Sequence, residues 1–384
     1  MTGKRLLAAF LGASLLLSGC GPAGGSQGAF DASSEENGKL KVAVTLFPYY
    51  DFVRQIAGDQ VDLQMVIPAG MDSHSFEPTP ADIRTIQHAD VLISNGGTME
   101  HWLEDTLGAL DTSNMTIVTM MDYVDTVEEE IVEGMEDAGH DHDHAHSHAA
   151  VDDHDHSHET PEEHAAHAQE ADDHDHSHET PEEHAAHAQE ADDHDHSDYV
   201  DHDGHEEAIE YDEHIWTSPV NAMKLVDVIG ETLAEADPAH AEVFRQGAAD
   251  YKKELEEIDA GFREVSRNRK RNMIVMGDKF PFRYLADEYQ LDYRAAFSGC
   301  SSDTEPSAKT IAYLIDKVKE EQIPVVYYLE LSSHRVSEII GEETGAEPLL
   351  LHSCHNVTRA QFDAGITYAG LMRQNIENLR KGID

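Results

Sequence analysis

Two stretches of the chain alternate short apolar runs with helix-like segments, and this alternation restricts the folds that are available. The first stretch runs from residue 40 to about 135, and the second from residue 273 to 384. Strands that alternate with helices along a chain form a parallel sheet with helices on its faces. The sequence therefore predicts an α/β protein with two lobes, each built on a central parallel sheet flanked by helices.

The period of the apolar residues locates the expected elements. In the first lobe we expect strands at 39–46, 61–67, 91–94 and 116–119, and helices at 47–57, 81–88 and 99–107. In the second lobe we expect strands at 273–276, 325–329 and 348–351, and helices at 282–288, 307–320, 335–344 and 362–379. A long helical stretch, 219–267, joins the lobes, and Pro238 within it marks a break or a new helix start.

Residues 139–205 differ in composition from both lobes. The twenty-residue segment at 152–171 is repeated without change at 172–191, and 19 of the 27 histidines lie in this region. Because it has almost no large apolar residues, we expect a disordered His/Asp-rich insertion in the first lobe. Imidazole suits zinc, copper and nickel, so the insertion is expected to bind metal with modest affinity and fast exchange.

The formal net charge of −51 argues against a nucleic-acid partner. Much of the negative excess belongs to the insertion, so the average does not describe the two lobes.

The amino-terminal residues have the pattern of a bacterial export signal. Lys4 and Arg5 precede the apolar run 6–17, which is too short for a permanent membrane span, and Leu17-Ser18-Gly19-Cys20 looks like a lipobox. We expect a signal peptide at 1–19, a lipidated Cys20, and a flexible tether at 20–39. The protein would then lie outside the cytoplasm, anchored to the cell membrane by lipid.

The remaining cysteines are Cys300 and Cys354. In an extracytoplasmic protein an even pair is interpreted first as a disulfide. The alternative is a pair of thiolate ligands that complete a Cys2His2 metal site.

Two histidines outside the insertion stand in distinctive surroundings. His74 lies in the segment from Gly70 to Asp82, GMDSHSFEPTPAD, directly after an expected strand. His214 lies in the segment His214-Ile215-Trp216, directly after the insertion. A lone loop histidine is usually only a polar surface residue, but these contexts favour metal ligands.

At these residues the chain resembles the receptor lipoproteins that deliver zinc and manganese to ABC importers. The family's G-x-x-x-H-x-F/Y-x-P-x-P-x-D and H-x-W segments are matched at His74 and His214. Further agreement is found at Ser94-Asn95-Gly96-Gly97, at Glu100 and Trp102, at Thr304–Ser307 and in the tail 368–379. The resemblance covers the mature chain apart from the insertion, which zinc-specific members often carry at this place. It implies two α/β lobes, a long connecting helix and one metal in the cleft between the lobes.

The second lobe departs from the family pattern. The family usually supplies a His or Glu at the end of the first strand of this lobe, and here that position falls on Lys279, which cannot bind metal while protonated. Asp278 could substitute for it. The fourth family donor comes from the loop after the last strand, where His355 and His352 are both available. The expected metal ligands are His74, His214, Asp278 and His355, with His352 as the alternative to the last.

The resemblance predicts the domain order and the function together. The boundaries are a metal-binding lobe at 40–218 containing the insertion 139–205, a connecting helical region at 219–271, and a metal-binding lobe at 272–384. The predicted function is capture of Zn²⁺ and its delivery to an ABC importer permease by a monomeric receptor. Alternatives are a manganese receptor, or a surface protein for zinc buffering or cell adhesion that relies on the insertion. No HExxH helix, nucleophile elbow or phosphate-binding loop indicates an enzyme.

Overall fold

The computed structural model describes residues 30, 38–135, 210–301 and 305–384. The expected signal peptide 1–19, Cys20, nearly all of the tether 20–39 and the insertion 139–205 lie outside the described residues. Residues 38–135 and 210–384 belong to a single unit by their contacts. None of the helices in these described ranges combines the length and the apolar character that a membrane crossing requires.

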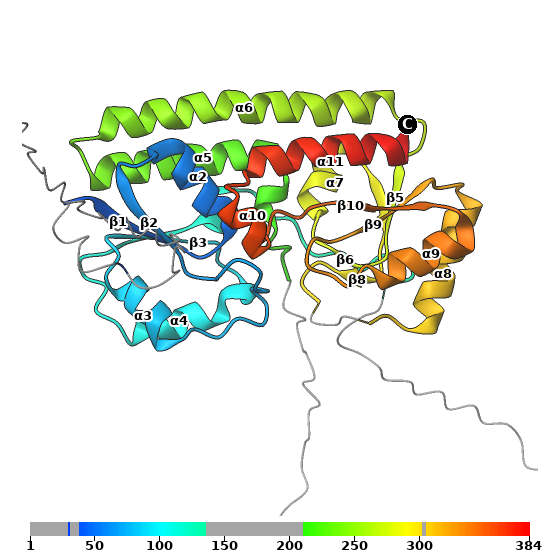
Figure 1. The fold of residues 1–384 in the computed structure, drawn as a ribbon, viewed down its shortest axis with the longest axis horizontal. Coiled ribbons are helices and arrows are strands. Elements are labelled where there is room, and N and C mark those ends of the chain that lie inside the picture. Colours follow the sequence, from blue (N-terminus) through cyan, green and yellow to red (C-terminus); the bar gives the residue numbers. More distant parts are fainter. Residues whose placement is uncertain (1–29, 31–37, 136–209, 302–304) are drawn as a thin grey trace, which may run out of the picture. The chain divides into compact units, whose positions relative to one another are not determined.

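The first stretch of alternating elements forms a four-stranded parallel sheet (Figure 1). Its strands are β1 (Leu40–Val44), β2 (Val61–Met65), β3 (Val91–Ser94) and β4 (Thr116–Thr119), in the order β2-β1-β3-β4. The connecting helices are α2 (Phe47–Ala57), α3 (Pro80–Gln87) and α4 (His101–Gly108), with the short 3-10 turns η1 (Thr98–Glu100) and η2 (Met120–Tyr123). The predicted strands and helices of this lobe are confirmed to within a few residues.

The second stretch repeats the same topology. Strands β5 (Met273–Met276), β7 (Asp292–Arg294), β9 (Val325–Tyr328) and β10 (Glu347–Leu350) form a parallel sheet in the order β10-β9-β5-β7. In each sheet, the strand that comes first in the sequence lies between the second and the third strands of that sheet. The helices here are α7 (Arg283–Tyr289), α8 (Ala308–Glu320) and α9 (Arg335–Thr344). A second, two-stranded sheet pairs β6 (Lys279–Phe280) with β8 (Phe297–Ser298). The predicted α/β class with parallel sheets is confirmed.

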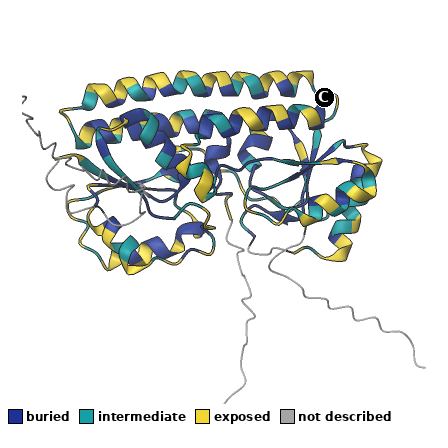
Figure 2. Cartoon of the chain, in the orientation of Figure 1, coloured by how far each residue is buried: buried dark blue, intermediate teal, exposed yellow. Residues whose placement is uncertain are grey.

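The helical stretch between the sheets consists of two helices, α5 (Pro219–Ala236) and α6 (Ala241–Asn268), which separate near Pro238 as predicted. Helix α6 packs against α5, α2, α11 and α7, so it contacts helices that follow strands of both sheets. Its buried residues recur every three or four positions, from Phe244 to Val265. Figure 2 shows this buried stripe beside an exposed outer face. This spacing is that of a helix with one apolar face.

The single helix expected at 362–379 is instead two helices, α10 (Arg359–Asp363) and α11 (Tyr368–Ile383). Gly365 between them has a φ of +72°, a left-handed conformation that ends a helix. The Thr367 side chain then accepts a hydrogen bond from the backbone N–H of Gly370 and begins α11.

Close contact between α6 and α2 depends on a glycine. A Cβ atom at Gly247 would lie 2.2 Å from the carbonyl oxygen of Ile56. We expect Gly247→Ala to lower the free energy of unfolding by about 1–3 kcal/mol, because a backbone atom cannot yield as a side chain would. Guanidinium unfolding measures this difference.

Gly108→Ala is the matched control, because a Cβ at this position in α4 meets nothing within 4 Å. This variant should be unchanged or more stable by up to about 1 kcal/mol, owing to the higher helix propensity of alanine. Equal unfolding free energies for the two variants would contradict the packing explanation.

Candidate metal centre

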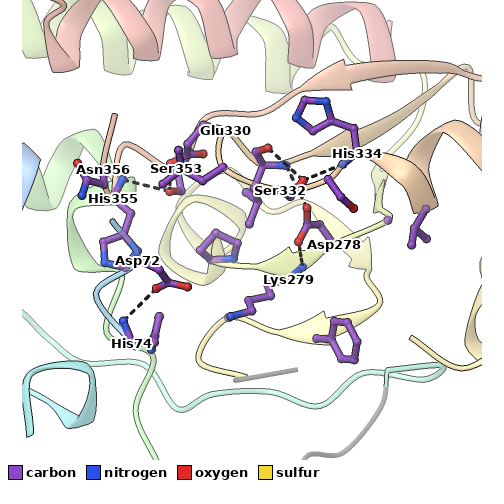
Figure 3. A pocket seen from close by; sticks show the side chains of 18 of the residues that line it. Asp72, His74, Asp278, Lys279, Glu330, Ser332, His334, Ser353, His355 and Asn356 are labelled. Carbon is purple, nitrogen blue, oxygen red and sulfur yellow. Dashed lines mark hydrogen bonds between the residues drawn. The ribbon is translucent and has the colours of Figure 1, made fainter. Parts of the chain in front are cut away.

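Three histidines that are far apart in the sequence meet in the structure. One ring nitrogen from each of His74, His214 and His355 lies within 4.8 Å of the other two. The ring centroids are separated by 6.0 Å for His74–His214, 5.6 Å for His74–His355 and 5.5 Å for His214–His355. Figure 3 shows His74 and His355 facing the same pocket from different loops. Among the described residues, this is the group of His, Cys, Asp and Glu that can share a metal ion.

His74 is held by the loop between β2 and α3. The backbone N–H of His74 donates to Asp72 Oδ1 at 2.9 Å. After His74 the ring of Phe76 is buried against Trp102, with ring centroids 5.1 Å apart. Thr79 then begins α3 with a capping box formed with Asp82. The residues of the family-like segment therefore fix both ends of the loop that presents the histidine.

His214 is almost completely buried just before the 3-10 turn η5 (Ile215–Thr217). Asp212 Oδ1 accepts the backbone N–H of His214 at 2.8 Å and lies 3.2 Å from its ring Nδ1. A carboxylate on Nδ1 leaves Nε2 as the donor for a metal. The Trp216 indole N–H donates to the Ser353 carbonyl at 2.9 Å, so this segment is tied to the loop that carries His355.

His355 lies in the loop after β10. Its backbone N–H donates to Ser353 Oγ at 3.1 Å, and its Nε2 is hydrogen-bonded to the Ser73 hydroxyl. The side-chain amide of Asn356 donates to the carbonyls of Pro68 and Met71, at 2.9 and 2.7 Å. These bonds join the loops that carry His74 and His355.

The backbone of each of the three histidines is held by the same kind of local hydrogen bond. Each is preceded two residues earlier by a side-chain oxygen that accepts its backbone N–H, from Asp72, Asp212 and Ser353 respectively. Such turns fix the backbone where a side chain must point in one direction. The spacings Asp-x-His and Ser-x-His are visible in the sequence, and they are a signal that distinguishes these three histidines.

His352, the alternative to His355, lies outside the group. It is buried, and its Nδ1 accepts the backbone N–H of Cys354 at 3.0 Å. The left-handed conformation of Cys354, with a φ of +61°, separates the directions of the two histidines. The structure therefore brings His355, and not His352, to His74 and His214.

Asp278 does not join the three histidines either. Its Oδ1 accepts the backbone N–H of Lys279 at 2.9 Å and its Oδ2 that of Leu329 at 3.4 Å. Asp278 lines the same cavity, but its carboxylate satisfies N–H groups just after the ends of β5 and β9. The expectation that Asp278 supplies the third donor is not met by this geometry.

The expected disulfide is corrected by the structure, in which Cys300 and Cys354 are both free. Cys300 lies beside Glu129, whose Oε1 accepts its backbone N–H, whereas Cys354 Sγ lies 3.8 Å from the His352 carbonyl. Burial raises the pKa of both thiols. Neither belongs to the histidine group, so the Cys2His2 alternative is not formed either.

The three imidazoles differ in their affinity for protons. Burial, followed by the charge of His214, lowers the pKa of His74 to about 4. Burial and the two neighbouring histidines lower the pKa of His355 well below its usual value. Burial acts in the same direction on His214, but the charge and hydrogen bond of Asp212 outweigh it with help from Glu213, so the pKa of His214 is raised. Two of the rings are therefore neutral and ready to bind a metal at neutral pH.

The histidines open onto a cavity of about 420 Å³ lined by loops from both sheets. Lys279, Glu330 and Ser332 are among its lining residues (Figure 3). Three imidazole donors suit zinc, which binds histidine nitrogen at about 2.0–2.1 Å and takes four ligands. The present separations allow such binding after small movements of the loops, with one position left for a ligand from the cavity.

The chain matches the family described as "ZnuA: Zinc-uptake complex component A periplasmic" over residues 42–382. Zinc-binding protein AdcA of Streptococcus pyogenes serotype M18 is 31% identical over 347 residues, which are 90% of this chain and 56% of the relative. The chain thus spans about half the length of this relative. High-affinity zinc uptake system protein ZnuA of Bacillus subtilis is 27% identical over 369 residues, covering 96% of this chain and 94% of the relative.

Solved structures agree with this match. The Zn(II)-bound ZnuA-like domain of Streptococcus pneumoniae AdcA has a TM-score of 0.61 at 25% identity, covering 90% of this chain and all of that domain. The metal-dependent lipoprotein YcdH of Bacillus subtilis has the same fold, with a TM-score of 0.62 at 24% identity over 90% of this chain and 99% of that one. With its sequence matched from the first strand to the last helix, the chain belongs to the family of zinc-uptake complex component A.

Proposed function

We propose that the protein is the extracytoplasmic receptor of a zinc importer, which captures Zn²⁺ at His74, His214 and His355 and delivers it to an ABC permease. The observation that carries this proposal is the meeting of three imidazoles in one cavity. Transport, and not catalysis, is proposed because the matched family is a component of zinc uptake. The binding of zinc by AdcA and the zinc uptake of ZnuA, as their names state, support the proposal.

The donor set favours zinc over manganese. Manganese prefers carboxylate and other oxygen ligands, whereas imidazole suits zinc. The carboxylates nearest the site are engaged elsewhere, since Asp72 and Asp212 each accept the backbone N–H of the histidine that follows. A neutral set of three nitrogens is therefore proposed as a zinc site.

The place of the protein in the cell forms part of the proposal. The lipobox-like sequence ending at Cys20 supports a lipid anchor, which would hold a monomeric receptor beside its permease. The insertion at 139–205 is proposed to collect zinc at modest affinity near the tighter site.

We expect isothermal titration to find one tight zinc equivalent that survives deletion of residues 139–205 and is lost in His74→Ala. Loss is expected because two imidazoles bind zinc far more weakly than three. Manganese titrated under the same conditions should bind much more weakly. His88→Ala is the matched control, because His88 is an exposed histidine at the end of α3.

If deletion of 139–205 abolished all tight zinc binding, the three-histidine site would not be the receptor site. Zinc buffering or adhesion through the insertion would then be the better explanation.

The pKa directions predict how zinc binding depends on pH. Zinc requires neutral imidazole, so a proton must leave any ring that is charged in the free protein. The pKa of His214 is raised, so a proton competes with zinc there as the pH falls, whereas His74 stays neutral down to about pH 4. We therefore expect about one proton to be released per zinc near pH 6, against two or more for three unshifted histidines.

The number of protons is measured by titrating the variant without 139–205 in buffers of different ionisation enthalpy. In Asp212→Asn the charge that raises the pKa of His214 is removed, and the release should fall below one proton at the same pH. Release of two or three protons per zinc from the protein with Asp212 intact would show that the site is not tuned in this way.

A further inference from the structure

Among the described residues, the three-histidine group has no fourth protein donor. A tetrahedral zinc site needs four donors, and the group in the structure contains three. The cavity lining contains four carboxylates, those of Asp72, Asp278, Glu305 and Glu330, and none of them belongs to the histidine group. Three of the four already accept backbone N–H groups, and that of Glu305 is exposed. The fourth position is therefore open to a molecule from the cavity.

Lys279 extends into this cavity from the short strand β6. Figure 3 shows its side chain reaching toward the part of the pocket that holds His74. Its ammonium group makes no hydrogen bond or ion pair with any residue in the described ranges. Burial is the main cause of the lowered pKa of His74 and of His355, and the charge of Lys279 lowers both further. Within the described part of the chain, the ammonium therefore has no polar partner, and its side chain reaches toward the metal site.

A bound zinc ion and the Lys279 ammonium would place positive charge together at the histidine end of the cavity. Three neutral imidazoles add no negative charge to Zn²⁺, and Lys279 adds a positive one. The carboxylates nearby offset part of this charge, but none of them belongs to the histidine group or forms an ion pair with Lys279; they are those of Asp72, Asp212, Asp278, Glu305 and Glu330. An anion that touches both the zinc and Lys279 would neutralise charge at the position where the protein supplies none.

The cavity has room for more than a water molecule. Its volume is about 420 Å³, whereas a water molecule occupies about 30 Å³ in the liquid. Ser332, Ser333 and Arg335 also line it, and their side chains carry hydrogen-bond donors. A site for a bare zinc ion and one water would not need this space.

We propose that the protein binds zinc together with a small carboxylate, which takes the fourth coordination position and pairs with the ammonium group of Lys279. This inference rests on the proposed zinc site and adds a second ligand class to it. A carboxylate fits because its two oxygens can bind the metal and accept from Lys279 at the same time. The carboxylate is either a simple counter-ion or part of a zinc chelate.

The test is equilibrium dialysis of the full chain, loaded with one equivalent of zinc, against radiolabelled acetate or citrate. We expect about one carboxylate retained per bound zinc, and none without zinc. In Lys279→Gln the affinity for the carboxylate, measured per bound zinc, should fall about tenfold or more, as expected for one lost charge-assisted hydrogen bond. Retention of both acids would indicate a counter-ion, and retention of citrate alone a chelate.

Two further variants sharpen the result. Lys279→His supplies a fourth imidazole, so it should exclude the carboxylate and bind zinc more tightly than the natural chain. Lys319→Gln removes an exposed lysine near the end of α8 and should retain the carboxylate as the natural chain does. Thermal unfolding of each variant confirms that it is folded.

Equal carboxylate retention in Lys279→Gln and the natural chain would overturn the proposal, as would no retention in the natural chain. Zinc titration in carboxylate-free buffer separates this failure from failure of the receptor function. Tight zinc binding that depends on His74 would leave the receptor function standing even if the carboxylate were not retained.

Discussion

The site depends on one buried and two half-buried imidazole rings that remain able to bind a metal. Buried imidazoles are costly unless their polar atoms find partners, and a charged ring costs more than a neutral one. Asp212 and the Ser73 hydroxyl are hydrogen-bonded to the rings of His214 and His355, respectively. The backbone of each of the three histidines is fixed separately, by a side-chain oxygen two residues earlier. Of the three rings, only that of His214 faces a carboxylate through Nδ1, and its pKa is the one that is raised. Protonation and metal binding are thereby coupled mainly at one residue.

The topology places the loops where such a site can form. In open parallel sheets, binding sites lie beyond the carboxyl ends of the strands. His74 follows β2, Lys279 follows β5 and His355 follows β10, so all three come from that edge of their sheets. The Asn356 amide and the Trp216 indole then tie these loops together through hydrogen bonds to backbone carbonyls. Both sheets have the same strand order, so the loops that line the cavity follow the carboxyl ends of strands in each sheet.

Much of the fold could be predicted from the sequence, because long apolar periods and capping residues are local signals. Strands β3, β4 and β5 and helices α2 and α9 were predicted with their observed bounds. Strands β6 and β8 have only two residues each, which is too few to show an alternation of apolar and polar residues, so they could not be predicted. His74 and His214 were identified from their segments, but the choice between His355 and His352 depends on the left-handed turn at Cys354. The disulfide was inferred from the expected extracytoplasmic location and from the even number of cysteines. Neither indicates where the two thiols lie in the fold, and in the structure they have different neighbours.

Anomalous diffraction at the zinc edge from crystals of the zinc-loaded protein tests the central claim most directly. The three-histidine account predicts a peak in this cavity, at about 2.0–2.1 Å from one nitrogen each of His74, His214 and His355. It also predicts a non-protein ligand on the side of Lys279. A peak bonded to the sulfur of Cys300 or Cys354 at about 2.3 Å, or to Asp278 in place of one of the histidines, would contradict the account.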